Sequence, residues 1–103
     1  MEINFKNVDE VIALAKEREY EKLRNYMAEK GYEFVREVEA LMYMGLTRGS
    51  EEKMTAIDSF EDYKRNLREE KDIFAEIDHM LSKSSFGRAL ENGTIEIKAE
   101  LGL

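Results

Sequence analysis

Apolar residues recur every three or four positions along most of the chain, a spacing typical of amphipathic helices. The first such segment starts at Asn7, which forms a variant of the capping box with Glu10. Its apolar positions are Val8, Val11, Ile12 and Ala15, continuing through Leu23 and Met27. The pattern leaves open whether the chain bends at 17–19. Gly31 is the expected stop, because glycine commonly follows the last residue of a helix.

A second helical segment is predicted over 32–44. Its apolar stripe consists of Phe34, Val35, Val38, Leu41 and Met42. Arg36, Glu37 and Glu39 fall largely off this stripe. The stretch 45–50 contains two glycines and predicts a break between helices.

The longest helix is predicted from Asp58 or Ser59 to Leu81. Its seam is formed by Phe60, Tyr63, Leu67, Phe74, Ile77 and Leu81, with Glu70 in the one polar slot. This spacing is close to that of a coiled-coil seam. We expect the seam residues to be buried in the fold or in a homodimer formed through this helix.

A short helix is predicted over 86–92, with Gly93 closing it. Ile95, Ile97, Ala99 and Leu101 then alternate with polar residues, as in a half-buried strand, and Met1, Ile3 and Phe5 alternate at the other end. A short β-ribbon of the two termini and two extended tails fit this pattern equally well. The fold class predicted for residues 1–103 is a single all-α domain, a small helical bundle with one long helix.

The amino-acid composition and net charge exclude or disfavour several classes of function. The 103 residues include no cysteine and no proline, and 23 acidic against 16 basic side chains give a net charge of −7. The missing cysteines exclude disulfides and thiol nucleophiles. The negative charge disfavours direct contact with nucleic acid or anionic membranes and favours a basic protein partner. With no signal peptide or spanning segment in the pattern, a cytoplasmic location is expected.

Motifs of catalysis are sparse. Asp72, Glu76 and His79 share spacing that could support a mononuclear metal site, but His79 is the only histidine, and a surface histidine beside a carboxylate is the plainer interpretation. The chain contains neither a Gly-x-Ser-x-Gly elbow nor a phosphate-binding glycine loop. The sequence therefore predicts no enzyme, no cofactor and no metal site.

One binding site is predicted, in which two helix ends are joined. Arg18, Glu19 and Tyr20 lie at one predicted helix end, and Gly45, Arg48 and Gly49 lie at another. Helix ends expose unpaired backbone groups and mobile side chains to ligands. The alternative is that Arg18 and Arg48 pair internally with carboxylates such as that of Glu19.

Three stretches resemble a bacterial family catalogued as domain of unknown function 3775. The first runs from Ile3-Asn4 through the Lys16-Glu17-Arg18-Glu19-Tyr20-Glu21 step, and the second is Glu39–Gly45 followed by Arg48-Gly49. The third, 80–93, is similar to the family's leucine-rich ending before Glu-x-Gly. The resemblance implies an all-helical domain and implies no activity.

Three functions fit these observations. The first is a non-enzymatic, acidic helical module for protein interaction, including self-association. The second is an anti-CRISPR-like phage inhibitor that occupies a basic nucleic-acid groove of its target. The acidic and basic residues of this chain are interleaved, however, so a stripe of negative charge that imitates phosphates is not obvious. The third is a small-ligand or nucleotide binder that uses Arg18, Arg48 or Arg88.

Overall fold

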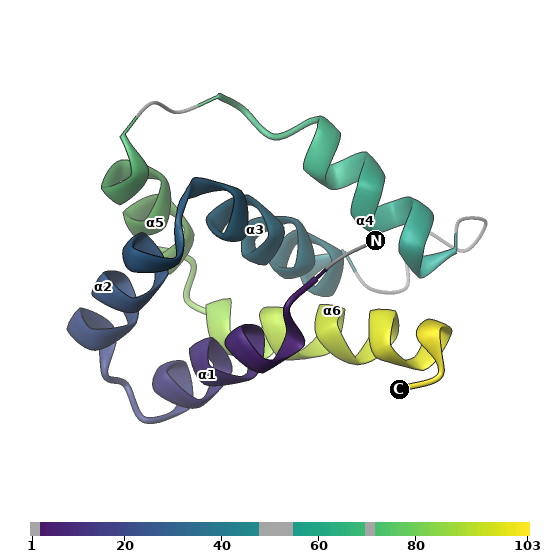
Figure 1. Cartoon of the computed structure of the whole chain (residues 1–103), viewed down its shortest axis with the longest axis horizontal. Helices are drawn as coiled ribbons and strands as arrows, with labels where there is room; N and C mark the ends of the chain where they lie inside the picture. The colour runs from purple at the N-terminus through teal and green to yellow at the C-terminus, as the bar shows by residue number, and fades with distance from the viewer. Residues whose placement is uncertain (1–2, 48–54, 70–71) are drawn as a thin grey trace.

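Six α-helices follow one another through the part of the chain that the computed structural model describes, residues 3–47, 55–69 and 72–103 (Figure 1). In chain order they are α1 Phe5–Lys16, α2 Tyr20–Lys30, α3 Tyr32–Leu46, α4 Ala56–Arg65, α5 Ile73–Leu81 and α6 Phe86–Leu101. None of the described residues belongs to a strand, so the predicted all-α class is confirmed. Within the same residues, no helix has both the length and the apolar character needed to cross a membrane.

Helix α3 is the central element and packs against α2, α4, α5 and α6. Figure 1 shows it lying between α4 and α6, with α2 and α5 next to one of its ends. Val35, Val38, Leu41 and Met42 are fully buried on it. A helix enclosed by several neighbours buries most of its circumference rather than a single stripe. Polar residues of α3 that lie off the apolar stripe can therefore also be buried.

Helices α3 and α6 cross with their backbones in contact. A Cβ atom added at Gly45 would overlap the Ala89 carbonyl, and one added at Gly93 would overlap the Leu41 carbonyl. Only glycine permits this approach, because it has no side chain. The predictions that Gly45 begins a connector and that Gly93 ends a helix are therefore wrong: both glycines lie inside helices and serve their crossing.

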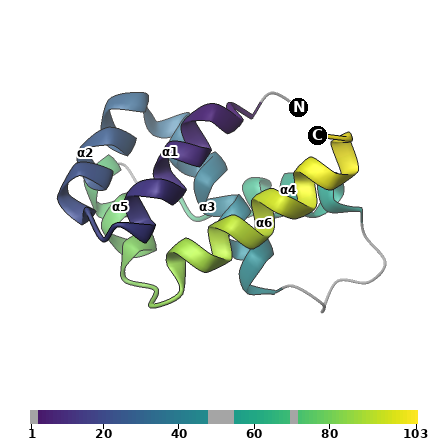
Figure 2. The same ribbon diagram turned by 90° about the horizontal axis from the view of Figure 1, so that it is seen from below.

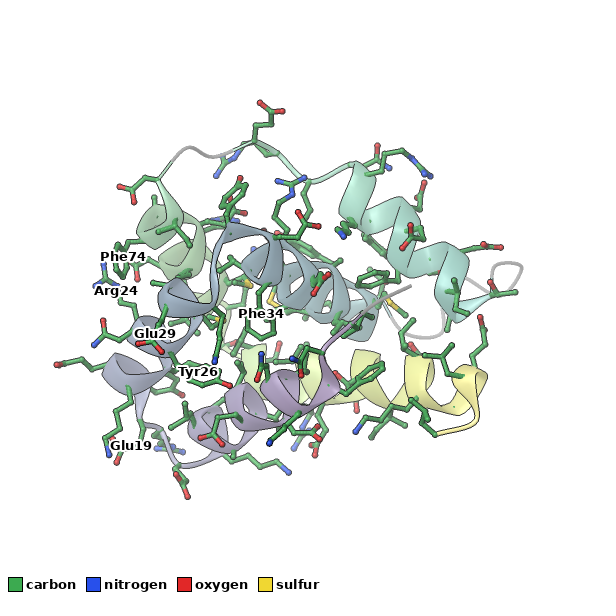
Figure 3. The ribbon with its side chains drawn as sticks, viewed as in Figure 1. Glu19, Arg24, Tyr26, Glu29, Phe34 and Phe74 are labelled. Atoms are coloured by element: carbon green, nitrogen blue, oxygen red, sulfur yellow. The ribbon has the colours of Figure 1, made fainter. Side chains whose placement is uncertain are left out.

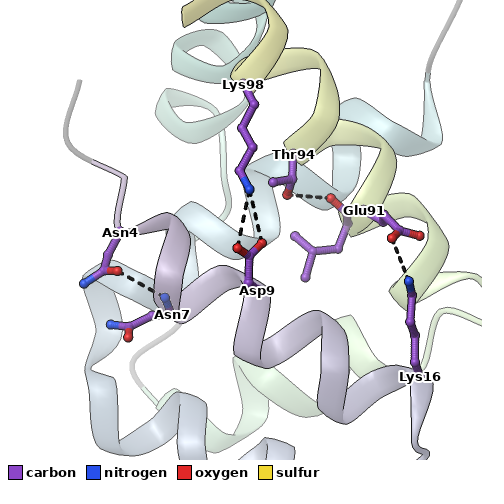
Figure 4. A network of polar contacts seen from close by, with 8 residues as sticks. Asn4, Asn7, Asp9, Lys16, Glu91, Thr94 and Lys98 are labelled. Atoms are coloured by element: carbon purple, nitrogen blue, oxygen red, sulfur yellow. Dashed lines mark hydrogen bonds and ion pairs between the residues drawn. The ribbon is translucent and has the colours of Figure 1, made fainter. Parts of the chain in front are cut away.

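Helix α1 lies along α6, as the view from below shows (Figure 2). Two ion pairs join these helices (Figure 4): Lys16 Nζ lies 2.7 Å from Glu91 Oε2, and Lys98 Nζ lies 3.4 Å from both carboxylate oxygens of Asp9. Such exposed pairs contribute at most about 1 kcal/mol each. The fully buried Val8 and Val11 of α1 contribute more to its attachment.

The helix boundaries in the first third of the chain follow from caps and turns. Asn4, not the predicted Asn7, caps α1, because Asn4 Oδ1 accepts a hydrogen bond from the Asn7 N–H at 3.1 Å. The open question of a bend at 17–19 is answered by Arg18, whose left-handed φ of 58° ends α1. Gly31 separates α2 from α3 with a φ of 103°, which confirms the predicted stop.

The predicted single long helix over 58–81 is wrong, because two helices occupy this range and the described residues between them, 66–69 and 72, are not helical. The Asn66 side chain donates to the Asp62 carbonyl at 2.9 Å at the end of α4. Asp72 caps the start of α5 by accepting from the Phe74 N–H at 2.9 Å. The Asn66 and Asp72 side chains form hydrogen bonds with backbone groups that would otherwise bond within a continuous helix. This competition favours a helix end at each of the two residues.

The seam predicted on that helix is only partly enclosed. Ile77 is fully buried, whereas four seam residues are half-buried: Tyr63, Leu67, Phe74 and Leu81. The guanidinium carbon of Arg24 lies 4.3 Å from the centre of the Phe74 ring (Figure 3). Arg24 Nε also forms an ion pair with Asp78 Oδ1 at 2.8 Å. The predicted homodimer interface thus loses the continuous helix face on which it depended.

The predicted strand after Gly93 is also wrong, since α6 continues without a break to Leu101. The alternation from Ile95 to Leu101 is misleading because Ile95 and Leu101 are exposed and only Ile97 among the large residues is buried. Buried positions on α6 follow helical spacing instead; they are Phe86, Ala89, Leu90, Gly93, Thr94 and Ile97. At the other end, Phe5 is the first residue of α1, and Met1 lies outside the described residues.

Candidate functional site

The strongest candidate site is a pocket between α3, α4 and α5, which we call the carboxyl pocket. Its volume is about 250 Å³, and it is lined by Glu39, Tyr43, Tyr63, Asn66, Leu67, Arg68, Glu76 and His79. Drug-sized ligands usually occupy about 300–1,000 Å³. The carboxyl pocket is smaller than that and matches a group the size of one side chain.

Two glutamates on the carboxyl pocket are buried. Glu39 on α3 is 3% exposed and Glu76 on α5 is 5% exposed. One oxygen of each carboxyl group, Oε1, has no hydrogen-bond partner among the residues that the structure describes. A buried polar atom without a partner costs about 1–3 kcal/mol, so these two oxygens lower the stability of the fold and can accept hydrogen bonds from a donor placed in the pocket.

The Glu39 carboxyl group keeps its proton near neutral pH. Burial, reinforced by the adjacent Glu76 carboxyl, raises the pKa of Glu39 to about 8, and the nearby Arg36 and Arg68 oppose this rise only in part. Burial beside another carboxyl group disfavours the charged form, so Glu39 retains a proton that an isolated glutamate in water would lose. The charge of the pocket therefore changes with pH at Glu39.

Aromatic residues form one wall of the carboxyl pocket. The rings of Tyr43 and Tyr63 are stacked, with centroids 6.2 Å apart and planes inclined by 19°. The Tyr63 hydroxyl is hydrogen-bonded to Thr47 Oγ1 at 2.7 Å, which holds the end of α3 against α4. Burial raises the pKa of the Tyr43 phenol, which accordingly stays neutral. This wall offers π-faces and no negative charge of its own.

Arg68 and His79 complete the lining, together with Asn66 and Leu67. Arg68 lies between α4 and α5 and makes no hydrogen bond or ion pair with any residue in the described ranges. Asp72, the third member of the metal set considered from the sequence, caps α5 instead. Across 3–47, 55–69 and 72–103, no three acidic or histidine side chains are grouped as metal ligands.

Sequence patterns missed Glu39 and suggested Glu76 only through its spacing from His79. Glu39 falls off the main apolar stripe, and it is nevertheless buried because α3 is enclosed on several sides. One sequence signal was present: Glu39 stands directly between the apolar residues Val38 and Ala40. A charge within an apolar run on a central helix is a candidate for a buried, shifted group.

The predicted binding residues separate into different places. Arg18 and Tyr20 line a second concave surface, which we call the arginine hollow, and Arg88 joins them there. Glu19 precedes α2 and is exposed without lining either cavity (Figure 3). Gly45 is occupied by the α3–α6 crossing. Arg48 and Gly49 lie outside the described residues, so the predicted union of the two helix ends stays untested.

No protein-family model matches the chain, and comparisons with curated proteins and with solved structures find no match in either group. The resemblance to domain of unknown function 3775 therefore stays a prediction.

Proposed function

We propose that the protein is a non-enzymatic binding module that receives a positively charged group of a basic partner in the carboxyl pocket. The observation that carries the proposal is the pair of buried carboxyl groups, Glu39 and Glu76, each with an oxygen that lacks a donor. An ammonium or guanidinium group supplies only donors and a positive charge. It therefore complements this pair better than a neutral or anionic ligand does.

Two further features support a cationic ligand. Tyr43 and Tyr63 present stacked rings on the wall of the pocket, and cations are attracted to the faces of such rings. The net charge of −7 favours the approach of a basic partner from solution. The absence of a nucleophile motif in the sequence favours binding over catalysis.

The inhibitor of a basic groove receives less support. Such an inhibitor would need a continuous band of acidic charge. Several acids instead pair with bases on neighbouring helices: Glu91 with Lys16, Asp78 with Arg24, and Glu33 with Lys64. The carboxyl pocket, which complements a cationic donor group, selects its ligand more specifically than this surface of mixed charge does.

The proposal is tested with butylammonium as the probe and butanol as its uncharged analogue. We expect butylammonium at pH 8.5 to shift the NMR signals of the Tyr43 and Tyr63 rings in a saturable way, and butanol to leave them in place. Glu39→Gln should weaken this binding roughly tenfold or more, the loss of one charge-assisted hydrogen bond. Glu29→Gln on α2, an exposed site outside the pocket, is the matched control and should bind normally.

A second arm distinguishes a free amine from a side chain of a partner protein. A short peptide with one lysine is compared with the same peptide acetylated at that lysine. Tighter binding of the lysine peptide than of butylammonium indicates a protein partner, whereas equal affinity indicates a small amine. Equal effects of butylammonium and butanol, or equal affinities of the Glu39→Gln and Glu29→Gln variants, would refute the proposal.

A further inference from the structure

The arginine hollow lies between the α1–α2 turn and the start of α6. Its volume is about 520 Å³, within the range of pockets that hold small metabolites. Ala15 and Gly87 are among its lining residues, and a Cβ on Gly87 would lie 3.3 Å from the Ala15 Cβ. These small residues leave the space open, and it shares no lining residue with the carboxyl pocket.

Two arginines that have no partner among the described residues line this hollow from separate segments of the chain. Arg18 comes from the turn after α1 and Arg88 from the first turn of α6, and neither guanidinium forms a hydrogen bond or ion pair in the described part of the chain. Arg24 and Arg65, in contrast, are each paired with an aspartate. In a protein of net charge −7, two arginines left unpaired on one concave surface indicate an anion from outside.

The rest of the lining is suited to a phosphate group and to a planar substituent on it. Ser84 and Ser85 bring hydroxyl groups that make no hydrogen bond with the described residues. Glu91, the one acid on the hollow, is neutralised by Lys16 at 2.7 Å (Figure 4). Tyr20 is 49% exposed at the rim and offers a ring on which a base or sugar can stack.

We propose that the arginine hollow binds a phosphate-bearing small molecule, with Arg18 and Arg88 gripping the phosphate oxygens. A guanidinium matches phosphate geometry through two parallel hydrogen bonds, which a lysine cannot form. Two such groups from separate segments can contact different oxygens of one phosphate. Tyr20 then contacts what the phosphate carries.

The left-handed backbone of Arg18 makes a sharp test of this proposal. Its N–H donates to the Ala15 carbonyl and the Glu19 N–H donates to the Leu14 carbonyl, the hydrogen bonds of a Schellman motif. Glycine is the residue that best fits this position. Arg18→Gly therefore removes the guanidinium while relieving the backbone, so that lost binding cannot be attributed to lost folding.

The probes are inorganic phosphate, adenosine monophosphate and adenosine, titrated at constant ionic strength. We expect phosphate and the nucleotide to shift the backbone amide signals of Gly87 and Arg88, and adenosine alone to leave them unchanged. Arg18→Gly and Arg88→Gln should each weaken nucleotide binding about tenfold, with the melting temperature of Arg18→Gly equal to or above that of the parent. Arg65→Gln, which removes a positive charge on α4 away from the hollow, is the control and should bind normally.

The nucleotide arm also identifies the source of the phosphate. Tighter binding of the nucleotide than of phosphate, lost in Tyr20→Ala, assigns the hollow to a phosphorylated metabolite with a planar group. Equal affinities assign it to free phosphate. The proposal is overturned by adenosine binding as well as the nucleotide, by the absence of saturable binding at millimolar concentration, or by Arg18→Gly binding as tightly as Arg65→Gln.

Discussion

Glu39 shows how one residue links stability to the charge of the site. Its carboxyl group is buried on α3 beside Glu76, and this burial raises its pKa to about 8 from an ordinary value of 4.5. Between these two values the folded protein binds more protons at Glu39 than the unfolded chain does. The linkage between proton binding and folding then requires stability to fall as the pH rises through this window.

This pH dependence of stability can be measured directly. We expect the free energy of unfolding, measured by urea titration, to fall from pH 5 to pH 8, with a slope approaching about 1.4 kcal/mol per pH unit. Glu39→Gln removes the titrating group and should flatten the profile, while Glu29→Gln should keep the parent slope. Parallel profiles for the two variants would contradict the assignment of the raised pKa to Glu39.

Some helix boundaries were predictable, and the places where others were not have physical reasons. The Gly31 stop and the start of α6 at Phe86 were both visible in the sequence. The break between α4 and α5 was missed because the apolar spacing continues across it. The hydrogen bonds that end one helix at Asn66 and start the next at Asp72 are local and polar, and a hydrophobic pattern does not register them.

Glycine within a helix was the second source of error at this scale. Gly93 looks like a helix end in isolation, because glycine weakens a helix by roughly 1 kcal/mol relative to alanine. Only the partner helix reveals why it is there: the Leu41 carbonyl occupies the space that a Cβ would need. A sequence taken one helix at a time contains no information about that partner.

Replacing this glycine tests the crossing. Gly93→Ala should destabilise the protein despite the better helix propensity of alanine, because the Leu41 carbonyl can move only with α3. We expect a loss near the upper end of the roughly 1–3 kcal/mol typical of overpacked cores, measured by thermal and urea unfolding. The matched control in the same helix is Gly87→Ala, whose Cβ would meet only the Ala15 Cβ at 3.3 Å. If Gly93→Ala were the more stable of the two, the close crossing would be refuted.

At the scale of the whole molecule, both candidate sites are assembled from segments far apart in the sequence. The carboxyl pocket joins α3 to α5, and the arginine hollow joins the α1–α2 turn to α6. Arg18 and Arg88 were each recognisable as candidates for ligand binding, but only the packing of α1 on α6 brings them together. Residue chemistry was therefore predictable at these sites, whereas the grouping of residues depended on helix packing that the sequence pattern does not specify.

The net charge of −7 acts on the molecule as a whole and should govern how fast a basic partner finds the carboxyl pocket. We expect the association rate of the lysine peptide, measured by stopped flow, to fall several-fold between low and physiological salt, while its dissociation rate changes little. A triple variant, Glu10→Gln, Glu17→Gln and Glu29→Gln, removes three exposed negative charges that line neither cavity. It should slow association and flatten the salt dependence with the dissociation rate preserved, because the contacts inside the pocket are intact. A change confined to the dissociation rate would show instead that these surface acids contact the bound peptide, and that long-range attraction by the protein's charge does not control the encounter.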